Sequence, residues 1–280
     1  MRQLSMIFIL ALIVAIVGYY NFSGPSVDPQ LLQIANHNYL EPTNTTCPTT
    51  PSGKAGSIDD NVTATGARYN LRTPTNYQAS VAHPLLVVFA PAGTSAKRSE
   101  RLTHLTQQAT EKGFIIAYAN NIRLSLKAIE TLASIPEDIQ QKWCIDPDRI
   151  YYTGHSDGGT ISHALSFLPD STAKPTAIAP SAAGLDAVSL KQYPCPAPTA
   201  VMVFHNTDDS HFDGFGRQAA NWWASCNQCS DELTAVDQEG CRRYKACPST
   251  RAQTYYCETP GTHADWPNKN TLMLDFFTQH

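Results

Sequence analysis

Apolar runs of strand length alternate along the chain with segments whose apolar residues recur at helical spacing. Residues 84–90 are apolar throughout, which is typical of a central parallel strand buried on both faces. Further strands are predicted at 114–118, 149–153, 176–182, 199–205 and 253–258, with an earlier strand pair within 62–72. Helices are predicted at 99–112, 135–143, 160–168, 213–225 and 271–279. This alternation predicts an α/β domain with a mostly parallel central sheet and helices on both faces.

The segment 151–159, which reads Y-Y-T-G-H-S-D-G-G, lies between a predicted strand and a predicted helix. Its centre fits G-x-S-x-G, a strand–turn–helix motif that lifts a serine hydroxyl out of a sheet. Gly154 and Gly158 suit the sharp turn because a side chain at either position would collide with neighbouring backbone. The motif predicts that Ser156 is a nucleophile. The alternative is a glycine-rich turn whose serine has no catalytic role.

A serine nucleophile needs a base to take its proton and a carboxylate to orient that base. In the fold where this motif occurs, the three catalytic residues follow one another along the chain as Ser, then Asp or Glu, then His. Each lies on a loop that follows a strand. Asp208 and Asp209 follow the strand at 199–205, and spacing does not separate them. His263 follows the last predicted strand and is the base candidate, since the remaining histidines lie at strand ends, in predicted helices or in other loops.

Acyl transfer also needs N–H donors for the oxyanion that develops in the transition state. The backbone N–H of Asp157, directly after the nucleophile, is one predicted donor. The second should come from the loop after the strand at 84–90. Pro91 has no N–H, so Ala92 and Gly93 are the candidates.

The N-terminus has the pattern of a targeting segment. Arg2 precedes an apolar run, so residues 1–24 are predicted to be a signal peptide or, through residues 4–20, an N-terminal membrane anchor. Residues 25–60 are expected to form a Pro/Thr-rich leader, and residues 61–280 a single catalytic domain. The globular part is therefore expected outside the cytoplasm, either secreted or periplasmic.

The chain has eight cysteines, and this even number agrees with export and predicts up to four disulfides. Five of the eight fall within 226–257, and their pairing cannot be deduced from sequence. Cys226 and Cys229 form a C-x-x-C, for which a redox pair and half of a zinc site are alternatives to structural disulfides. The net charge of −4 and pI of about 6.1 give no basic footprint for nucleic acid.

Three segments together resemble the extracellular α/β-hydrolase esterases of the polyhydroxybutyrate depolymerase and feruloyl esterase group. Residues 145–159 are similar to that family's V-D-P-x-R-V-Y-V-T-G-x-S-x-G-G element, residues 203–209 to its strand-H-G-T-x-D loop, and residues 261–267 to its G-G-H-x-W-P element. The resemblance covers about two-thirds of the chain, from Pro84 to the C-terminus, and implies the α/β-hydrolase fold. The chain departs from the family where Ala90-Pro91 replaces H-G, where Asn206 replaces a glycine, and where one extra residue precedes Trp266.

The resemblance implies Ser156, Asp209 and His263 as a catalytic triad, with Ala92 as the second oxyanion donor. It implies a serine esterase that acts without cofactor or metal on hydroxyacid polyesters or on feruloyl- and acetyl-type esters, small or polymeric. Trp266, with Trp222 and Trp223, is expected either to form a wall for the substrate or to belong to the core. There are two alternatives. One is an acyltransferase or peptidase with the same triad, and the other is a catalytically inactive binding protein with a hydrolase fold. The sequence carries no signal of oligomeric state.

Overall fold

The computed structural model describes residues 32–36, 47–49, 51–169, 171 and 173–280, which all belong to one compact unit, Leu32–His280. The predicted signal or anchor at 1–24 and much of the leader lie outside the described residues. Within the described ranges, no helix has the combination of length and apolar character that crossing a membrane requires.

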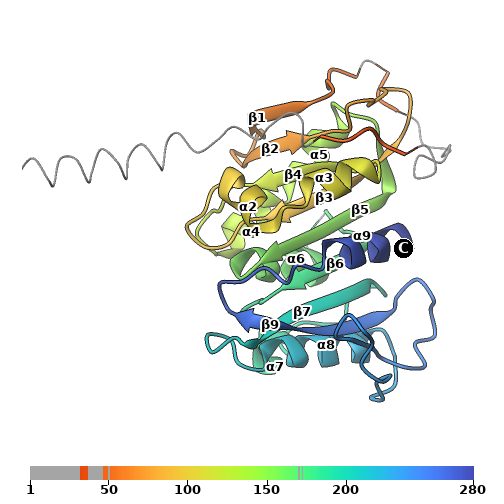
Figure 1. Ribbon diagram of the computed structural model, residues 1–280. Coiled ribbons are helices and arrows are strands. Elements are labelled where there is room, and N and C mark those ends of the chain that lie inside the picture. Colours follow the sequence, from red (N-terminus) through yellow and green to blue (C-terminus); the bar gives the residue numbers. More distant parts are fainter. Residues whose placement is uncertain (1–31, 37–46, 50, 170, 172) are drawn as a thin grey trace, which may run out of the picture. The chain divides into compact units, whose positions relative to one another are not determined.

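The described part of the chain is organised around a nine-stranded sheet with the order β1-β2-β4-β3-β5-β6-β7-β9-β8 (Figure 1). The strands from β4 to β9 pair in parallel, whereas β1, β2 and β8 pair antiparallel at the two edges. Their bounds are β1 Ser57–Val62, β2 Arg68–Arg72, β3 His83–Phe89, β4 Ile115–Ala119, β5 Ile145–His155, β6 Ala177–Ser181, β7 Ala200–Asp208, β8 Cys241–Arg243 and β9 Thr254–Thr262. The parallel strands therefore end at one common edge, where a site is expected in an open α/β sheet.

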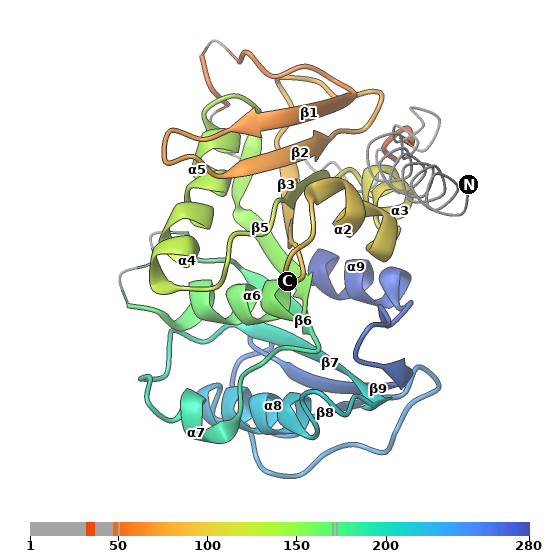
Figure 2. The same ribbon diagram turned by 90° about the vertical axis from the view of Figure 1, so that its left-hand side faces the viewer.

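Helices cover both faces of this sheet (Figure 2). One face is packed by α4 Leu126–Leu132, α5 Ser134–Gln140, α6 Asp157–Phe167, α7 Ala187–Leu190 and α8 Phe215–Cys226. The other is packed by α2 Ala96–Thr103, α3 Thr106–Glu111 and α9 Asn270–Thr278. Alternate residues of β3 enter the two cores, Val87 on one side and Val88 on the other, and both are fully buried. The prediction of an α/β domain with a mostly parallel sheet is thus confirmed.

Several predicted elements differ in detail from the structure. The helix predicted at 99–112 is two helices, because His104 adopts a φ of 51° and ends α2. The helix α4, the short helix α7 and the three-residue strand β8 were not predicted.

Part of the predicted leader lies within the described residues. The strand β1 begins at Ser57, four residues before the predicted boundary at 61. Backbone N–H groups of residues 33, 35 and 36 bond to Thr110, Asn76 and Glu111 respectively. The part of the leader that the structure describes is therefore attached to the sheet domain.

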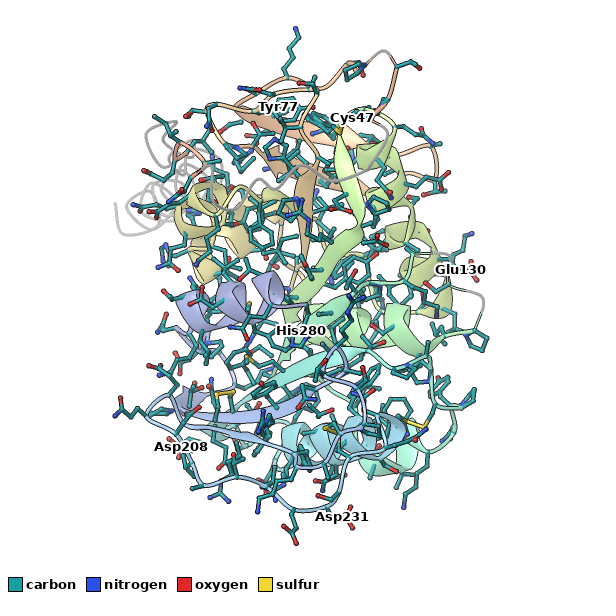
Figure 3. The ribbon with its side chains drawn as sticks, turned by 90° about the vertical axis from the view of Figure 1, so that its right-hand side faces the viewer. Cys47, Tyr77, Glu130, Asp208, Asp231 and His280 are labelled. Carbon is teal, nitrogen blue, oxygen red and sulfur yellow. A yellow bond between two sulfur atoms is a disulfide. The ribbon has the colours of Figure 1, made fainter. Side chains whose placement is uncertain are left out.

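All eight cysteines are paired, as Cys47–Cys144, Cys195–Cys226, Cys229–Cys247 and Cys241–Cys257 (Figure 3). Up to four disulfides were predicted, and the structure contains four. The two cysteines of the C-x-x-C bond to different partners, so this motif is neither a redox pair nor half of a zinc site. Four disulfides indicate an oxidising environment outside the cytoplasm.

Candidate active site

The turn between β5 and α6 holds Ser156 in a strained backbone conformation, with a φ of 56°. The turn is tight because the chain passes directly over β3. A Cβ added to Gly158 would lie 2.0 Å from the carbonyl oxygen of Phe89, and one on Gly154 would lie 2.6 Å from the same oxygen. The N–H of Ser156 donates to the carbonyl of Ser181 at 3.0 Å, which ties the turn to β6. Glycine at 154 and 158 is thus a packing requirement, as the motif predicted.

Three side chains from three loops meet at the carboxyl edge of the sheet. The Oγ of Ser156 lies 3.0 Å from Nε2 of His263, and Nδ1 of His263 lies 2.9 Å from Oδ2 of Asp209. Ser156 follows β5, Asp209 follows β7 and His263 follows β9. Since β7 and β9 are adjacent in the sheet, the carboxylate and the imidazole leave neighbouring strands. The structure therefore brings together the three residues that the resemblance implied.

Asp209, rather than Asp208, provides the carboxylate of this arrangement. Its side chain is fully buried, and its Oδ1 accepts the backbone N–H groups of His211 and Phe212, each at 3.0 Å. Asp208 is exposed, at the end of β7 on the periphery (Figure 3). Consecutive residues at a strand end point in opposite directions, which is why spacing alone left both candidates open.

The environment of Asp209 keeps its carboxylate ionised. Burial raises the pKa of Asp209, but the hydrogen bonds from His263 and from the Phe212 N–H, together with the nearby imidazoles, outweigh this effect, so the pKa is lowered overall. A carboxylate that stays charged holds the Nδ1 proton of His263 and leaves Nε2 free to accept the serine proton. His205 lies beside the same carboxylate, with its Nδ1 4.0 Å from Oδ2. Burial lowers the pKa of His205, so this second imidazole is neutral at pH 7.

Two aromatic side chains of the acid loop flank the imidazole of His263. The ring of His211 lies 4.8 Å from it between centroids, and the ring of Phe212 meets it edge-on at 5.0 Å.

His163, in contrast, is fully buried in α6 and accepts the indole N–H of Trp223 at 2.8 Å. Burial lowers the pKa of His163 to about 3, as expected for a packed core histidine.

The two predicted oxyanion donors are backbone N–H groups, one at the start of α6 and one in the loop after β3. Asp157 directly follows Ser156 and is the first residue of α6, so its N–H has no partner within the helix. In the loop after β3, the N–H of Gly93 donates to Oδ1 of Asn121 at 3.0 Å. This bond leaves Ala92, which is exposed, as the candidate in that loop. The amide of Asn121 was not among the predicted site residues.

Trp266 and Trp223 do not form the predicted aromatic wall, and Trp222 is half-buried against the same core as Trp223. Trp266 is 4 % exposed, packs in the core beside α9, and donates its indole N–H to Asn270 at 2.8 Å. Trp223 is fully buried on the other face of the sheet. Both rings therefore have the core role that was the alternative, because the apolar surface they would offer a substrate is already buried.

Two residues that were not predicted hold the loop that carries His263. The Nε2 of His155 lies 2.6 Å from the backbone carbonyl of His263, and the side-chain amide of Asn206 donates to two further carbonyls of the same loop. His155 stands at a variable position of the G-x-S-x-G motif, which specifies no side chain there. Asn206 was visible as a departure from the family's glycine, but its partners lie more than 50 residues away in the chain.

This arrangement has the geometry of nucleophilic acyl transfer: an aligned hydroxyl, imidazole and carboxylate, with N–H groups at the turn. Among the described residues, no group of three or more His, Cys, Asp or Glu side chains is arranged to hold a metal ion. The hydrogen bonds that join Ser156, His263 and Asp209 place the serine hydroxyl at the centre of the chemistry that this arrangement can perform.

Comparison with known proteins identifies the fold. Neither family models nor curated proteins match the chain. Among solved structures, an acetyl xylan esterase from Aspergillus awamori superposes with a TM-score of 0.60 at 12% identity, covering 81% of this chain and 100% of that chain. A truncated carbohydrate esterase from gut microbiota gives a TM-score of 0.57 at 12% identity, covering 84% and 99%.

An S-formylglutathione hydrolase from Staphylococcus aureus gives a TM-score of 0.53 at 12% identity, covering 79% of this chain and 96% of that chain. At such low identity these likenesses concern the fold alone. The chain has the α/β-hydrolase fold, as the sequence predicted.

Proposed function

We propose that the protein is an exported serine esterase that hydrolyses carboxylic esters. The observation that carries this proposal is the continuous hydrogen-bonded line from Ser156 Oγ through the imidazole of His263 to Asp209, at 3.0 Å and 2.9 Å. Isolated buried histidines and aspartates occur for structural reasons, but this order of groups at a strained strand–helix turn is typical of acyl transfer.

In the proposed reaction, Ser156 Oγ attacks the ester carbonyl while His263 Nε2 takes its proton. The N–H groups of Asp157 and Ala92 bind the oxyanion. His263 then protonates the leaving alkoxide, which departs and leaves an acyl-enzyme. Water attacks the acyl-enzyme with His263 again as base, releasing the acid and restoring Ser156. Asp209 orients the imidazole and stabilises its cation. The proposed reaction uses no metal or organic cofactor.

The substrate that we propose is an acyl ester on a carbohydrate or a hydroxyacid polyester. Two structural neighbours are described as a carbohydrate esterase and an acetyl xylan esterase, which supports acetyl groups on polysaccharide. The family resemblance supports feruloyl-type groups and the polyesters as well. The four disulfides support action outside the cytoplasm, where such polymers are found.

An ester panel tests this proposal directly: p-nitrophenyl acetate, acetylated xylan, methyl ferulate and hydroxybutyrate oligomers. We expect turnover of at least one of these, with kcat for Ser156→Ala and for His263→Ala lower by at least about a thousandfold. Ser210→Ala, an exposed serine in the acid loop, is the matched control and should retain wild-type kcat. Wild-type turnover in the Ser156→Ala protein would contradict the proposal.

One feature favours a second function, that of a catalytically inactive binding protein. In the loop after β3, which carries the predicted oxyanion donor Ala92, Ala90-Pro91 replaces the family's H-G. Covalent labelling by a fluorophosphonate separates the two functions. A reactive Ser156 should be labelled, and Ser156→Ala should not, whereas a silent scaffold should remain unlabelled. Product analysis with added alcohol or amine distinguishes hydrolysis from acyl transfer or peptidase activity by the same triad.

A further inference from the structure

The base of the proposed reaction is carried on an exposed turn. Thr262, Ala264 and Asp265 are exposed, and the side chain of His263 is 24% exposed. The turn closes on itself, since the carboxylate of Asp265 accepts both the N–H and the hydroxyl of Thr262 at 2.8 Å. The first residue of the turn, Thr262, ends β9 and pairs with Asp208 of β7. The bonds to Asp265 shape the turn beyond Thr262 but do not attach it to the sheet, and an imidazole on an unattached turn would not stay within 3 Å of a particular hydroxyl.

Three backbone carbonyls of this turn face buried donors. The side-chain amide nitrogen of Asn206 donates to the carbonyl of Thr262 at 2.7 Å and to that of Asp265 at 2.8 Å. The Nε2 of His155 lies 2.6 Å from the carbonyl of His263 itself. Because a carbonyl can only accept, Nε2 of His155 must carry the proton. The side chains of His155 and Asn206 thus hold the turn at three of its backbone carbonyls.

Both donors are buried and are themselves oriented by further hydrogen bonds. Asn206 is 2% exposed, and its Oδ1 accepts the hydroxyl of Thr259 at 2.5 Å, which fixes the direction of its amide. His155 is 3% exposed, and its Nδ1 lies 3.0 Å from the hydroxyl of Ser181. Burial lowers the pKa of His155, so the ring is neutral and its Nδ1 accepts that hydroxyl. Two oriented donors cannot follow the turn if it moves, so they define one position for it.

We propose that His155 and Asn206 are positioning residues that hold the imidazole of His263 between Ser156 and Asp209 by binding the backbone of its turn. His155 directly precedes Ser156 at the end of β5, and Asn206 lies three residues before Asp209 in β7. The strand β5, which precedes Ser156, and the strand β7, which precedes Asp209, therefore each also carry a residue that holds the turn of His263. This inference rests on the proposed function, because it takes His263 to be the base.

The kinetic test uses Asn206→Ala and His155→Leu, each of which removes donors to the turn. We expect kcat to fall by about a hundredfold in each, because a shift of about 1 Å in a reacting group has this cost, with KM changed by less than about threefold. His155→Gln, whose amide can donate to the same carbonyl, should recover at least about tenfold of that loss. A fall in kcat without this recovery would overturn the assignment of His155.

The matched control is Thr153→Val, in the same strand as His155. Its hydroxyl donates to the carbonyl of Ala179 at 2.6 Å and is fully buried, but it does not touch the turn. If this variant loses kcat as strongly as Asn206→Ala, the effect is a general one on the sheet and the proposal is wrong. Variants that do not fold are replaced by Asn206→Ser and His155→Asn, whose shorter side chains cannot reach the same carbonyls.

A second measurement does not depend on activity. Hydrogen–deuterium exchange of the peptide spanning residues 259–267 reports the order of the turn in the full chain. We expect exchange at least about tenfold faster in Asn206→Ala and His155→Leu, and unchanged in Ser156→Ala and Thr153→Val. Wild-type exchange rates in both positioning variants would overturn the proposal. If the wild-type protein hydrolyses no ester, the proposed function fails, yet the exchange data still decide whether these residues hold the turn.

Discussion

The serine turn and the segment between α8 and β9 are held in place by different means. At the turn, Gly154 and Gly158 bring backbone into direct contact with β3, and nothing but hydrogen could occupy the space. Residues 227–253, in contrast, are mostly exposed and contain only β8 and an isolated bridge between Leu233 and Tyr244. Disulfides at Cys229, Cys241 and Cys247 hold that segment. One region depends on close packing and the other on covalent links.

This difference separates function from stability. At the site, a small change moves a reacting group and should remove activity, whether or not it also lowers stability. In the linked segment, no residue contacts Ser156, Asp209 or His263 through a hydrogen bond that the structure describes. Changes there should lower the free energy of unfolding and leave turnover intact.

The strongest test of the site is the pair Asp209→Asn and Asp208→Asn. Asparagine at 209 has nearly the same shape but cannot hold the Nδ1 proton of His263 as a charge would, so kcat should fall by about 10⁴. Asparagine at 208 changes an exposed group and should lower kcat by less than about threefold. Ester hydrolysis at pH 7 measures both. If Asp208→Asn showed the larger loss, the acid would lie one position earlier than the structure indicates.

The second test concerns the packing of the turn. In Gly158→Ala the new Cβ would lie 2.0 Å from the carbonyl oxygen of Phe89, so either β3 or α6 must shift. We expect a loss of at least about 3 kcal/mol in the free energy of unfolding, together with at least about a hundredfold in kcat. Urea denaturation and ester hydrolysis measure the two effects.

Gly66→Ala is the control for the cost of a new side chain. Gly66 has a φ of 93°, but nothing lies within 4 Å of its added Cβ. It should lose about 1–2 kcal/mol from backbone strain alone and keep its kcat. Equal losses of stability in the two variants would show that contact with β3 is not what requires glycine at 158.

These contrasts explain what could be predicted from sequence. The serine turn was readable because its constraint is local: two glycines and a serine within five residues satisfy it. The parallel strands were readable because burial on both faces leaves continuous apolar runs such as 84–90. The break at His104 was not readable, because residues on both sides of it have helical spacing, and a single residue at positive φ separates α2 from α3.

Contacts between distant loops were the least readable part. The pairing of Cys229 with Cys247 depends on how the chain folds between α8 and β9, and eight cysteines allow many pairings. Likewise, Asn206 meets Thr262 only because β7 and β9 are neighbours in the sheet. In the family resemblance Asn206 was merely a replaced glycine, and its two carbonyl partners gave no signal in sequence.

The third test removes one covalent link. The double variant Cys229→Ala with Cys247→Ala opens a loop closed across a separation of 18 residues. By chain entropy this should lower the free energy of unfolding by about 2–3 kcal/mol, while kcat and KM stay within about twofold of the wild-type values. Urea denaturation and the ester assay measure these quantities. A large loss of kcat in the folded double variant would show that the linked segment supports the site, and the two regions would no longer be separable.

The smallest expected effect is a pH dependence that belongs to the site alone. The pKa of Asp209 is lowered in the folded state because hydrogen bonds from His263 and Phe212 outweigh the effect of burial. A carboxyl group whose folded pKa lies below its unfolded value contributes stability that is fully present above the unfolded pKa, about 3.9. This contribution is lost as the pH falls through the lower, folded pKa.

The wild-type protein should therefore exceed Asp209→Asn in free energy of unfolding by a constant amount above about pH 5, and this difference should shrink below about pH 4. Urea denaturation of both proteins between pH 3 and pH 7 measures it. The disulfide variant should show no such trend relative to wild type, because paired cysteines do not titrate. A wild-type advantage over Asp209→Asn that grows as the pH falls would mean that burial, rather than hydrogen bonding, controls the carboxylate, and that the imidazole of His263 is held more weakly than its distance to Asp209 indicates.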